Sequence, residues 1–165
     1  MNHSEARDAA RSPLLRTKLA PLPLDNLSLI GRDALIERLF AARHLPLLVL
    51  GAPAGYGKST ALALLRRRLF QSGADVAWLS CDAADSEPSR LLEYILAALE
   101  QALPGCAPGT ASLLCDRANG SVEALLEAFV ADMRQLSGDL YLILDDVHRL
   151  RHPDLADVAR HLLGR

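Results

Sequence analysis

The amino-acid sequence predicts an α/β fold in which helices cover both faces of a mainly parallel β-sheet. Short apolar runs typical of buried strands alternate along the chain with longer segments of helical periodicity. A glycine-containing turn joins the first strand to the next helix, and a later apolar strand ends in two adjacent carboxylates. These observations are typical of a three-layer sandwich that binds its ligand at the carboxyl ends of parallel strands.

Length and composition are those of one ordinary globular domain. The chain has 165 residues, half of them apolar, and a formal net charge of -2 from 18 basic and 20 acidic side chains. This charge gives no overall attraction to nucleic acid or to an anionic membrane. Cys81, Cys106 and Cys115 lack the spacing of a disulfide framework or a zinc site, and we find no secretory signal or membrane-spanning run. We therefore expect a cytoplasmic protein without membrane contact.

The first half of the chain divides into a lead-in and the start of the α/β unit. Residues 1–28 contain Pro13, Pro21 and Pro23 with scattered charges, so we expect an extended arm or linker rather than a packed element. Residues 29–165 form the predicted domain. Within it, periodicity and apolar runs predict a helix over 32–43, a strand over 47–50, a helix over 58–71 and a strand over 76–80.

The second half continues the alternation of helices and strands. Pro88 suits the first turn of a helix that extends to about residue 104, and the connection from 104 to 120 is expected to hold one helical turn around Leu113. Ser121 is a favourable N-cap for a strongly periodic helix that stops at Gly138. A third strand is predicted over 140–144, and a last helix from Pro153 to the C-terminus.

A phosphate-binding loop is the clearest motif in the sequence. The pattern is G-x-x-x-x-G-K-[ST] with alanine in first place, and its expected nucleotide-binding residues are Ala52, Pro53, Ala54, Gly55, Tyr56, Gly57, Lys58, Ser59 and Thr60. Glycines let backbone N–H groups turn towards phosphate, and the loop opens a helix whose N-terminus favours the same anion. We expect Lys58 to reach the β- and γ-phosphates of ATP and Ser59 to bind Mg²⁺. The alternative is a glycine-rich turn with a chance lysine, although Lys18 is the only other lysine in the chain.

The strand over 140–144 ends in two carboxylates that suit a magnesium site. Asp145 is the expected Mg²⁺ ligand, and Asp146 is expected to orient or deprotonate the attacking water, which makes Asp146 and Lys58 the candidate catalytic residues. The alternative is that the two residues only cap the following turn. His148 could contact the γ-phosphate.

Other polar residues have weaker assignments. Ile30 and Arg32 precede the first predicted helix and could lie against the adenine, or they could be an ordinary helix lead-in. Asp82 and Asp85 follow the second strand and share the expected ligand edge, but turn or capping roles are the alternative. Arg90 could contact phosphate or a partner, or lie on a solvated helix face.

Taken together, these pieces resemble the nucleotide-binding domain of the large ATP-dependent LuxR-family transcription activators. These activators are maltose-regulator-like members of the STAND class of P-loop NTPases. The resemblance runs from about Leu15 to the C-terminus, and it is carried by the loop spelling and by Asp145, Asp146 and His148 at the end of the acidic strand. Ala52, unusual for the general pattern, is ordinary for this family, whereas Cys81 stands where leucine is more frequent.

The resemblance implies a nucleotide-dependent switch. ATP with Mg²⁺ would favour an assembling state, ADP would favour a resting state, and hydrolysis would be slow. DNA would be bound only by a C-terminal domain that this chain does not show. In the family, a further strand follows the helix with which this chain ends and lies between the phosphate-loop strand and the acidic strand. The chain is therefore expected to be an incomplete P-loop NTPase domain, poorly active alone, with strands 47–50 and 140–144 parallel but not adjacent.

Two other readings remain open at this point. The chain could be a general AAA-type ATPase or a P-loop small-molecule kinase. In the kinase-like class, strands 47–50 and 140–144 would be direct neighbours. It could also be a degenerate fragment that binds no nucleotide.

Overall fold

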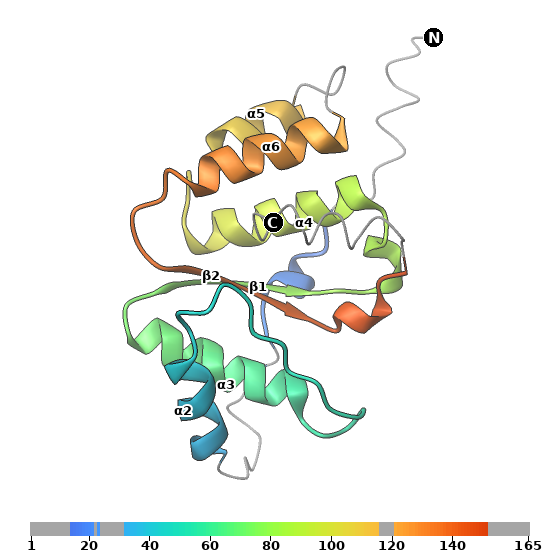
Figure 1. The fold of residues 1–165 in the computed structure, drawn as a ribbon. Coiled ribbons are helices and arrows are strands. Elements are labelled where there is room, and N and C mark those ends of the chain that lie inside the picture. The colour runs from blue at the N-terminus through green and yellow to red at the C-terminus, as the bar shows by residue number, and fades with distance from the viewer. Residues whose placement is uncertain (1–13, 22, 24–31, 116–120, 152–165) are drawn as a thin grey trace.

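The expected α/β architecture in three layers is present in the computed structural model, which describes residues 14–21, 23, 32–115 and 121–151 (Figure 1). A parallel sheet of β1 (Asp75–Ser80) and β2 (Leu140–Asp145) forms the middle layer. On one side lie α4 (Pro88–Ala102), α5 (Pro108–Cys115) and α6 (Val122–Met133), and on the other lie α2 (Asp33–Ala41) and α3 (Lys58–Gln71). The predicted fold class is confirmed.

The sheet separates two apolar clusters because alternate residues of a strand point to opposite faces. Val76 and Trp78 of β1 pack with Ile143 of β2 and with Leu65 and Leu69 of α3. On the other face, Ala77 and Leu79 of β1 pack with α4 residues that include Leu91, Ile95 and Leu99. Strand register runs from Asp75 opposite Leu140 to Ser80 opposite Asp145. Both strands therefore end at the same edge of the sheet.

Local capping explains why the helices of the second half begin where the sequence predicts. Pro88 occupies the first turn of α4, and the Glu87 carboxylate accepts hydrogen bonds from the backbone N–H groups of Ser89 and Arg90. The Ser121 hydroxyl accepts one from Ala124 at the start of α6. The connection before α6 holds α5, which has eight residues instead of the single turn expected around Leu113.

Part of the N-terminal segment is packed, contrary to the expected extended lead-in. Arg16–Leu19 form the short 3₁₀ helix η1, in which Lys18 and Leu19 are buried. Leu19 belongs to the apolar cluster between β1 and α4. The lead-in prediction failed here because the pairing of Lys18 with distant carboxylates, described below, has no local signal in the sequence. The domain boundary expected near residue 28 lies in the stretch 24–31, outside the described residues.

The strand predicted over residues 47–50 is wrong in this structure. These residues have no strand assignment, and Leu47 and Val49 are 55% and 81% exposed. A buried strand needs a hydrogen-bonded neighbour, and among the described residues β1 and β2 pair only with each other. No ladder therefore joins residues 47–50 to β2. An apolar run supplies the side chains of a buried strand but not the partner that would bury them.

Two further expectations from the sequence concern the last helix and contact with a membrane. The last predicted helix, from Pro153, lies outside the described residues. None of the helices in the described part of the chain is long and apolar enough to cross a membrane.

Candidate functional site

The phosphate-loop residues form an exposed turn that leads directly into α3. Gly55 and Gly57 have φ values of +80° and +71°, a backbone region that side chains with a Cβ rarely adopt. Gly57 is the N-cap of α3, and no side chain caps the first turn of that helix. Amide groups at such a terminus suit an anion, so the local backbone fits a phosphate group.

The side chain of Lys58 is hydrogen-bonded to the phosphate loop itself. Its ammonium group donates hydrogen bonds to the carbonyl oxygens of Ala52 at 2.7 Å and Pro53 at 3.0 Å. These contacts fold the side chain back across the loop, next to the amide groups at the start of α3. A phosphate bound at this place would lie within reach of the same ammonium group.

Arg32 lies against the loop, at the glycine that precedes Lys58. A Cβ built on Gly57 would come within 3.2 Å of Nη2 of Arg32, so the guanidinium group covers this glycine closely. Arg32 is also the N-cap residue of α2. The structure thus places Arg32 beside the phosphate loop, while Ile30, its expected companion at the adenine, lies outside the described residues.

Asp145 is a buried carboxylate at the end of β2, with 6% of its surface exposed. Its Oδ1 accepts a hydrogen bond of 2.9 Å from the backbone N–H of Asp146. Among the described residues, no lysine, arginine or histidine forms an ion pair with it. Because a buried charge normally has a partner of opposite sign, this carboxylate suits a bound cation such as Mg²⁺.

Asp146 has a different environment from its neighbour. Its φ of +56° is the only positive value among the described residues other than glycine, and it is the N-cap residue of the 3₁₀ helix η3 (Val147–Arg149). Its carboxylate lies 3.4 Å from Nε of Arg149 and 3.9 Å from Nδ1 of His148. The left-handed backbone turns the chain sharply and gives the two adjacent aspartates separate surroundings, as two separate roles would require.

The loop and the acidic strand end share one edge of the molecule. In Figure 1, the turn that leads into α3 and the helix η3 both lie on the side where β2 ends. Within the described part of the chain, Lys58 and Ser59 form no hydrogen bond or ion pair with Asp145 or Asp146. The structure therefore brings the two motifs to the same edge but not into contact.

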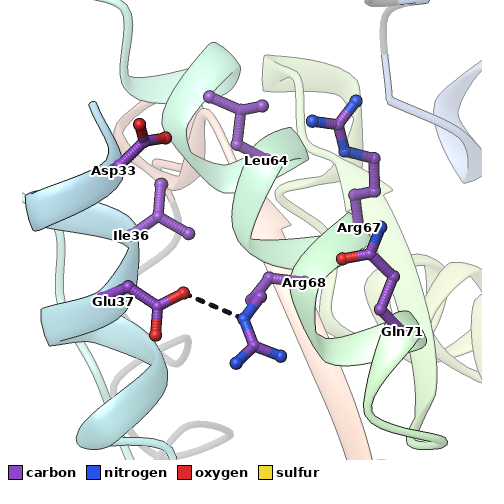
Figure 2. Close-up of a pocket in the computed structure, with 7 residues that line it drawn as sticks. All are labelled: Asp33, Ile36, Glu37, Leu64, Arg67, Arg68 and Gln71. Carbon is purple, nitrogen blue, oxygen red and sulfur yellow. Dashed lines mark hydrogen bonds and ion pairs between the residues drawn. The ribbon is translucent and has the colours of Figure 1, made fainter. Parts of the chain in front are cut away.

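A shallow hollow of about 180 Å³ lies elsewhere, between α2 and α3 (Figure 2). It is lined by Asp33, Ile36, Glu37, Leu64, Arg67, Arg68 and Gln71. Nε of Arg68 donates to Glu37 across it at 2.9 Å. None of the residues of the phosphate loop or the acidic strand end lines this hollow, so it is separate from the candidate site.

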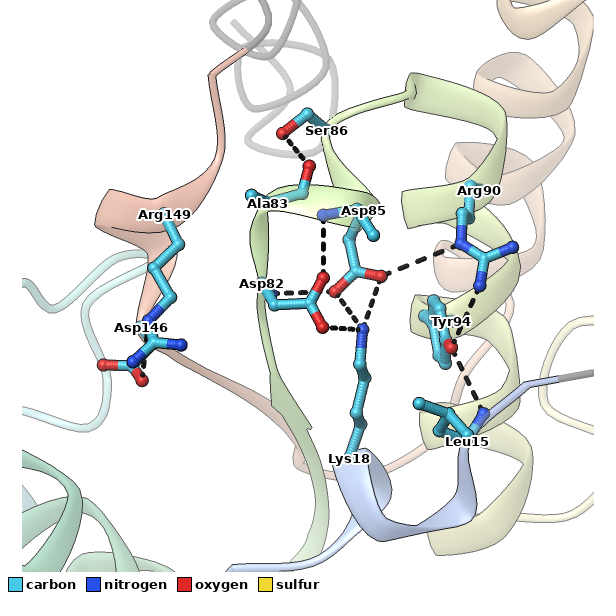
Figure 3. A network of polar contacts seen from close by, with 11 residues as sticks. Leu15, Lys18, Asp82, Ala83, Asp85, Ser86, Arg90, Tyr94, Asp146 and Arg149 are labelled. Carbon is cyan, nitrogen blue, oxygen red and sulfur yellow. Dashed lines mark hydrogen bonds and ion pairs between the residues drawn. The ribbon is translucent and has the colours of Figure 1, made fainter. Parts of the chain in front are cut away.

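Asp82 and Asp85 have the capping role that was the alternative for them (Figure 3). They form a capping box at the 3₁₀ helix η2 (Ala83–Asp85), in which Asp82 accepts from Ala84 N and Asp85 accepts from Asp82 N. Arg90 is not a fully solvated side chain, because its Nε lies 3.9 Å from Asp85 and its Nη2 donates to the Tyr94 hydroxyl at 3.4 Å.

Lys18 completes this group, and no role was predicted for it from the sequence. Its ammonium group contacts both carboxylate oxygens of Asp85 and one of Asp82, each at 2.7 Å. Burial alone would lower the pKa of Lys18, but the hydrogen bonds to Asp82 and Asp85 raise it above the usual value. The same contact with Lys18 lowers the pKa of Asp82. The scarcity of lysine was the one sequence signal that set Lys18 apart.

Comparison with known proteins places the chain in a family. Residues 28–165 match the family described as AAA ATPase domain. The chain is also 28% identical, over 151 residues, to the HTH-type transcriptional regulator MalT of Yersinia enterocolitica, and 27% identical to the MalT proteins of two Klebsiella pneumoniae strains. Each match covers 91% of this chain and 16% of the relative, so the chain spans about one sixth of their length. The chain belongs to the AAA ATPase domain family.

Proposed function

We propose that this chain binds ATP with Mg²⁺ and acts as the nucleotide-dependent switch of a larger transcriptional regulator. The observation that carries the proposal is the pairing of two features on the side of the molecule where β2 ends. One is a glycine-rich helix N-terminus with no side-chain cap, and the other is the buried Asp145 carboxylate, which has no cationic partner among the described residues. A triphosphate with its magnesium ion would complement both features at once.

The residues of the loop would divide the work of binding the nucleotide. Backbone N–H groups of residues 52–60 would hold the β-phosphate, while Lys58 would exchange its bonds to Ala52 and Pro53 for the β- and γ-phosphate oxygens. Ser59 and Asp145 would hold Mg²⁺, and Ile30 and Arg32 would border the nucleotide. The close approach of Arg32 to Gly57 supports a contact with phosphate in addition to the adenine contact.

Asp146 would serve as the residue that orients or activates water. Its carboxylate is shared with Arg149 and lies near His148, so it is less free to bind a metal ion than the carboxylate of Asp145. Such an arrangement suits slow hydrolysis, as a switch needs. ADP would then occupy the resting state.

The regulatory part of the proposal depends on the relatives. Proteins named HTH-type transcriptional regulator MalT match this chain along 91% of its length. We propose that the intact protein self-associates in its ATP state and contacts DNA through a different domain, since this chain has a net charge of -2 and lacks the composition of a DNA-binding surface. A cytoplasmic location would follow from this role.

A general AAA-type ATPase is the second candidate, and the family match favours it equally. The two candidates differ in whether ATP changes the assembly of the intact protein. Sedimentation of that protein with ATP or ADP separates them, because the switch predicts larger assemblies only with ATP.

Nucleotide binding is tested by Lys58→Ala, with Arg67→Ala as the matched control for lost positive charge on the same helix. Titration with a fluorescent ATP analogue, with Mg²⁺ and with EDTA, is expected to show an affinity loss of about 100-fold for Lys58→Ala, the scale of a lost charge-assisted phosphate contact. Arg67 is exposed and should be neutral. Circular dichroism should be unchanged in both variants, because the side-chain partners of Lys58 in the described part of the chain are loop carbonyls. Wild-type affinity in Lys58→Ala would refute the proposal.

A further inference from the structure

The ammonium group of Lys18 is the centre of a polar cluster that directly follows β1, and Lys18 and Asp85 are buried in it (Figure 3). The residue is 8% exposed and Asp85 is fully buried. Lysine is seldom buried unless it is paired, and here it contacts two carboxylates and lies 4.7 Å from the centre of the Tyr94 ring. Two cations, Lys18 and Arg90, balance the two aspartates of the cluster.

The cluster determines the path of the chain immediately after β1. Asp85 accepts from the backbone N–H of Asp82, and both carboxylates converge on Lys18. This ties the first residues after the strand to η1, 67 positions earlier in the sequence. The Tyr94 hydroxyl accepts from the backbone N–H of Leu15, which ties the same N-terminal segment to α4. Residues 81–86 are therefore held by the N-terminal segment as well as by their own capping box.

Residues 81–86 in turn hold both ends of the segment that carries the two aspartates of the site. The backbone N–H of Cys81 donates to the carbonyl oxygen of Asp145 at 2.9 Å. At the other end, the backbone N–H of Arg151 donates to the Ser86 hydroxyl oxygen at 3.0 Å. Both ends of the segment 145–151 are thus hydrogen-bonded to residues 81–86, the loop whose aspartates bind Lys18.

We infer that Lys18 is a positioning residue for the metal site: through Asp82 and Asp85 it fixes residues 81–86, and these fix the segment that presents Asp145 and Asp146. This inference deepens the proposed function and rests on it for the role of Mg²⁺. It gives the N-terminal segment a part in nucleotide binding although Lys18 contacts neither the phosphate loop nor the acidic strand end.

The first test measures the positioning without nucleotide, by amide hydrogen exchange of the 165-residue chain. Lys18→Met should accelerate exchange at Cys81 and Arg151, the two amides that hold the segment, and leave Leu125 in α6 unchanged. Arg16→Met is the matched control, because Arg16 is an exposed cation on the same 3₁₀ helix. Unchanged exchange at both amides in Lys18→Met would overturn the inference.

The second test measures the gain in nucleotide affinity when EDTA is replaced by Mg²⁺. Lys18→Met should reduce this gain by about tenfold, the scale for losing a group that orients a metal ligand. Affinity in EDTA should stay at the wild-type value, since the phosphate loop is untouched. An undiminished gain would overturn the inference, whereas a wild-type chain without any gain would refute the proposed function and leave the exchange test to decide the role of Lys18.

A second variant is needed in case Lys18→Met does not fold. Lys18→Met alone leaves the buried Asp85 without its main partner, so Lys18→Met/Asp85→Asn removes both charges and keeps an oxygen that can accept from Asp82 N. The double variant should fold and show the same faster exchange and the same reduced gain. Wild-type behaviour of the folded double variant would refute the positioning role.

Discussion

The two lysines of this chain differ in environment, because Lys18 is buried and the side chain of Lys58 bonds at the surface. Their comparison shows which roles of a lysine can be predicted from sequence. Lys58 is the first residue of α3, directly after an exposed turn, and among the described residues its side chain bonds only to the carbonyl oxygens of Ala52 and Pro53. Its motif identified it without any knowledge of the fold. Lys18 pairs with Asp85, which is 67 positions away and belongs to another element. Its role depends on tertiary structure, and no local pattern predicts it.

The adjacent aspartates of the site lead to a prediction at the same scale. Asp145 is buried and has no cationic partner among the described residues, whereas Asp146 is shared with Arg149. Asp145→Asn should therefore reduce the gain in nucleotide affinity on adding Mg²⁺ by about tenfold or more. Asp146→Asn should leave that gain nearly unchanged and mainly slow hydrolysis in the intact protein.

Titration with and without Mg²⁺, together with phosphate release, separates the two effects. Arg149→Ala is a useful companion, because it releases the Asp146 carboxylate without altering either aspartate. Equal losses of nucleotide affinity in Asp145→Asn and Asp146→Asn would contradict the division of roles.

At the scale of elements, prediction succeeded where the signal is local. The helix predicted over 58–71 matches α3 to the residue, because a left-handed glycine precedes it and Gly73 follows it with a φ of +87°. Ser121 likewise caps α6 as expected. The strand predicted over 47–50 failed because strand pairing is non-local, and its four residues carry no information about a neighbour.

In the candidate site, too, the local motifs were predicted from the sequence and the long-range contacts were not. The loop spelling and the acidic strand end were readable from the sequence, since each is a short motif with its own chemistry. Two other features of the site join parts of the chain that no sequence motif connects. They are the contact between Arg32 and Gly57 and the hydrogen bonds of segment 145–151 to residues 81–86. Such contacts follow from packing and could be found only in the structure.

Helix α5 depends on a carboxylate from another helix, which gives a prediction at this scale. Asp132 of α6 accepts hydrogen bonds from the backbone N–H groups of Gly109 and Thr110 and from the Thr110 hydroxyl, at 3.1, 2.8 and 2.7 Å. It is buried, so water cannot replace it fully. Asp132→Ala should lower the free energy of unfolding by about 2–3 kcal/mol, because two amides at the start of α5 lose their acceptor.

Urea unfolding followed by circular dichroism measures this change. Glu127→Ala removes a carboxylate from the exposed face of the same helix and should change stability by less than about 0.5 kcal/mol. A similarly small effect of Asp132→Ala would mean that α5 does not depend on this cap.

At the scale of the whole molecule, several carboxylates lie around the end of the sheet, among them Asp85, Asp145 and Asp146. The Cys81 thiol lies among them, immediately after β1, and is 3% exposed. Burial, with the nearby charges of Asp85, Asp145 and Asp146, raises the pKa of Cys81 to about 12, although Lys18 opposes the shift. The edge that suits a metal cation is thus a poor place for a thiolate.

This shift predicts how stability depends on pH. In the unfolded chain the thiol ionises near its ordinary value of 9.0, and in the folded chain only near 12. The contribution of Cys81 is therefore fully present below pH 9 and is lost as the pH rises towards 12, and the loss by pH 10 should be about 1 kcal/mol. Lys18, whose pKa is raised above 10.5, loses its contribution only at higher pH.

Comparing wild type with Cys81→Ala by urea unfolding at pH 7 and pH 10 isolates this thiol. The variant should lose less stability over that interval than the wild type, by about 1 kcal/mol. Cys106 also has a pKa raised by burial, but it is present in both proteins and cancels in the comparison. Cys115→Ala, which removes an exposed thiol, should lose as much stability as the wild type over the same interval. Parallel losses in wild type and Cys81→Ala would show that the thiol ionises as readily in the folded protein as in the unfolded chain, and that burial after β1 does not raise its pKa.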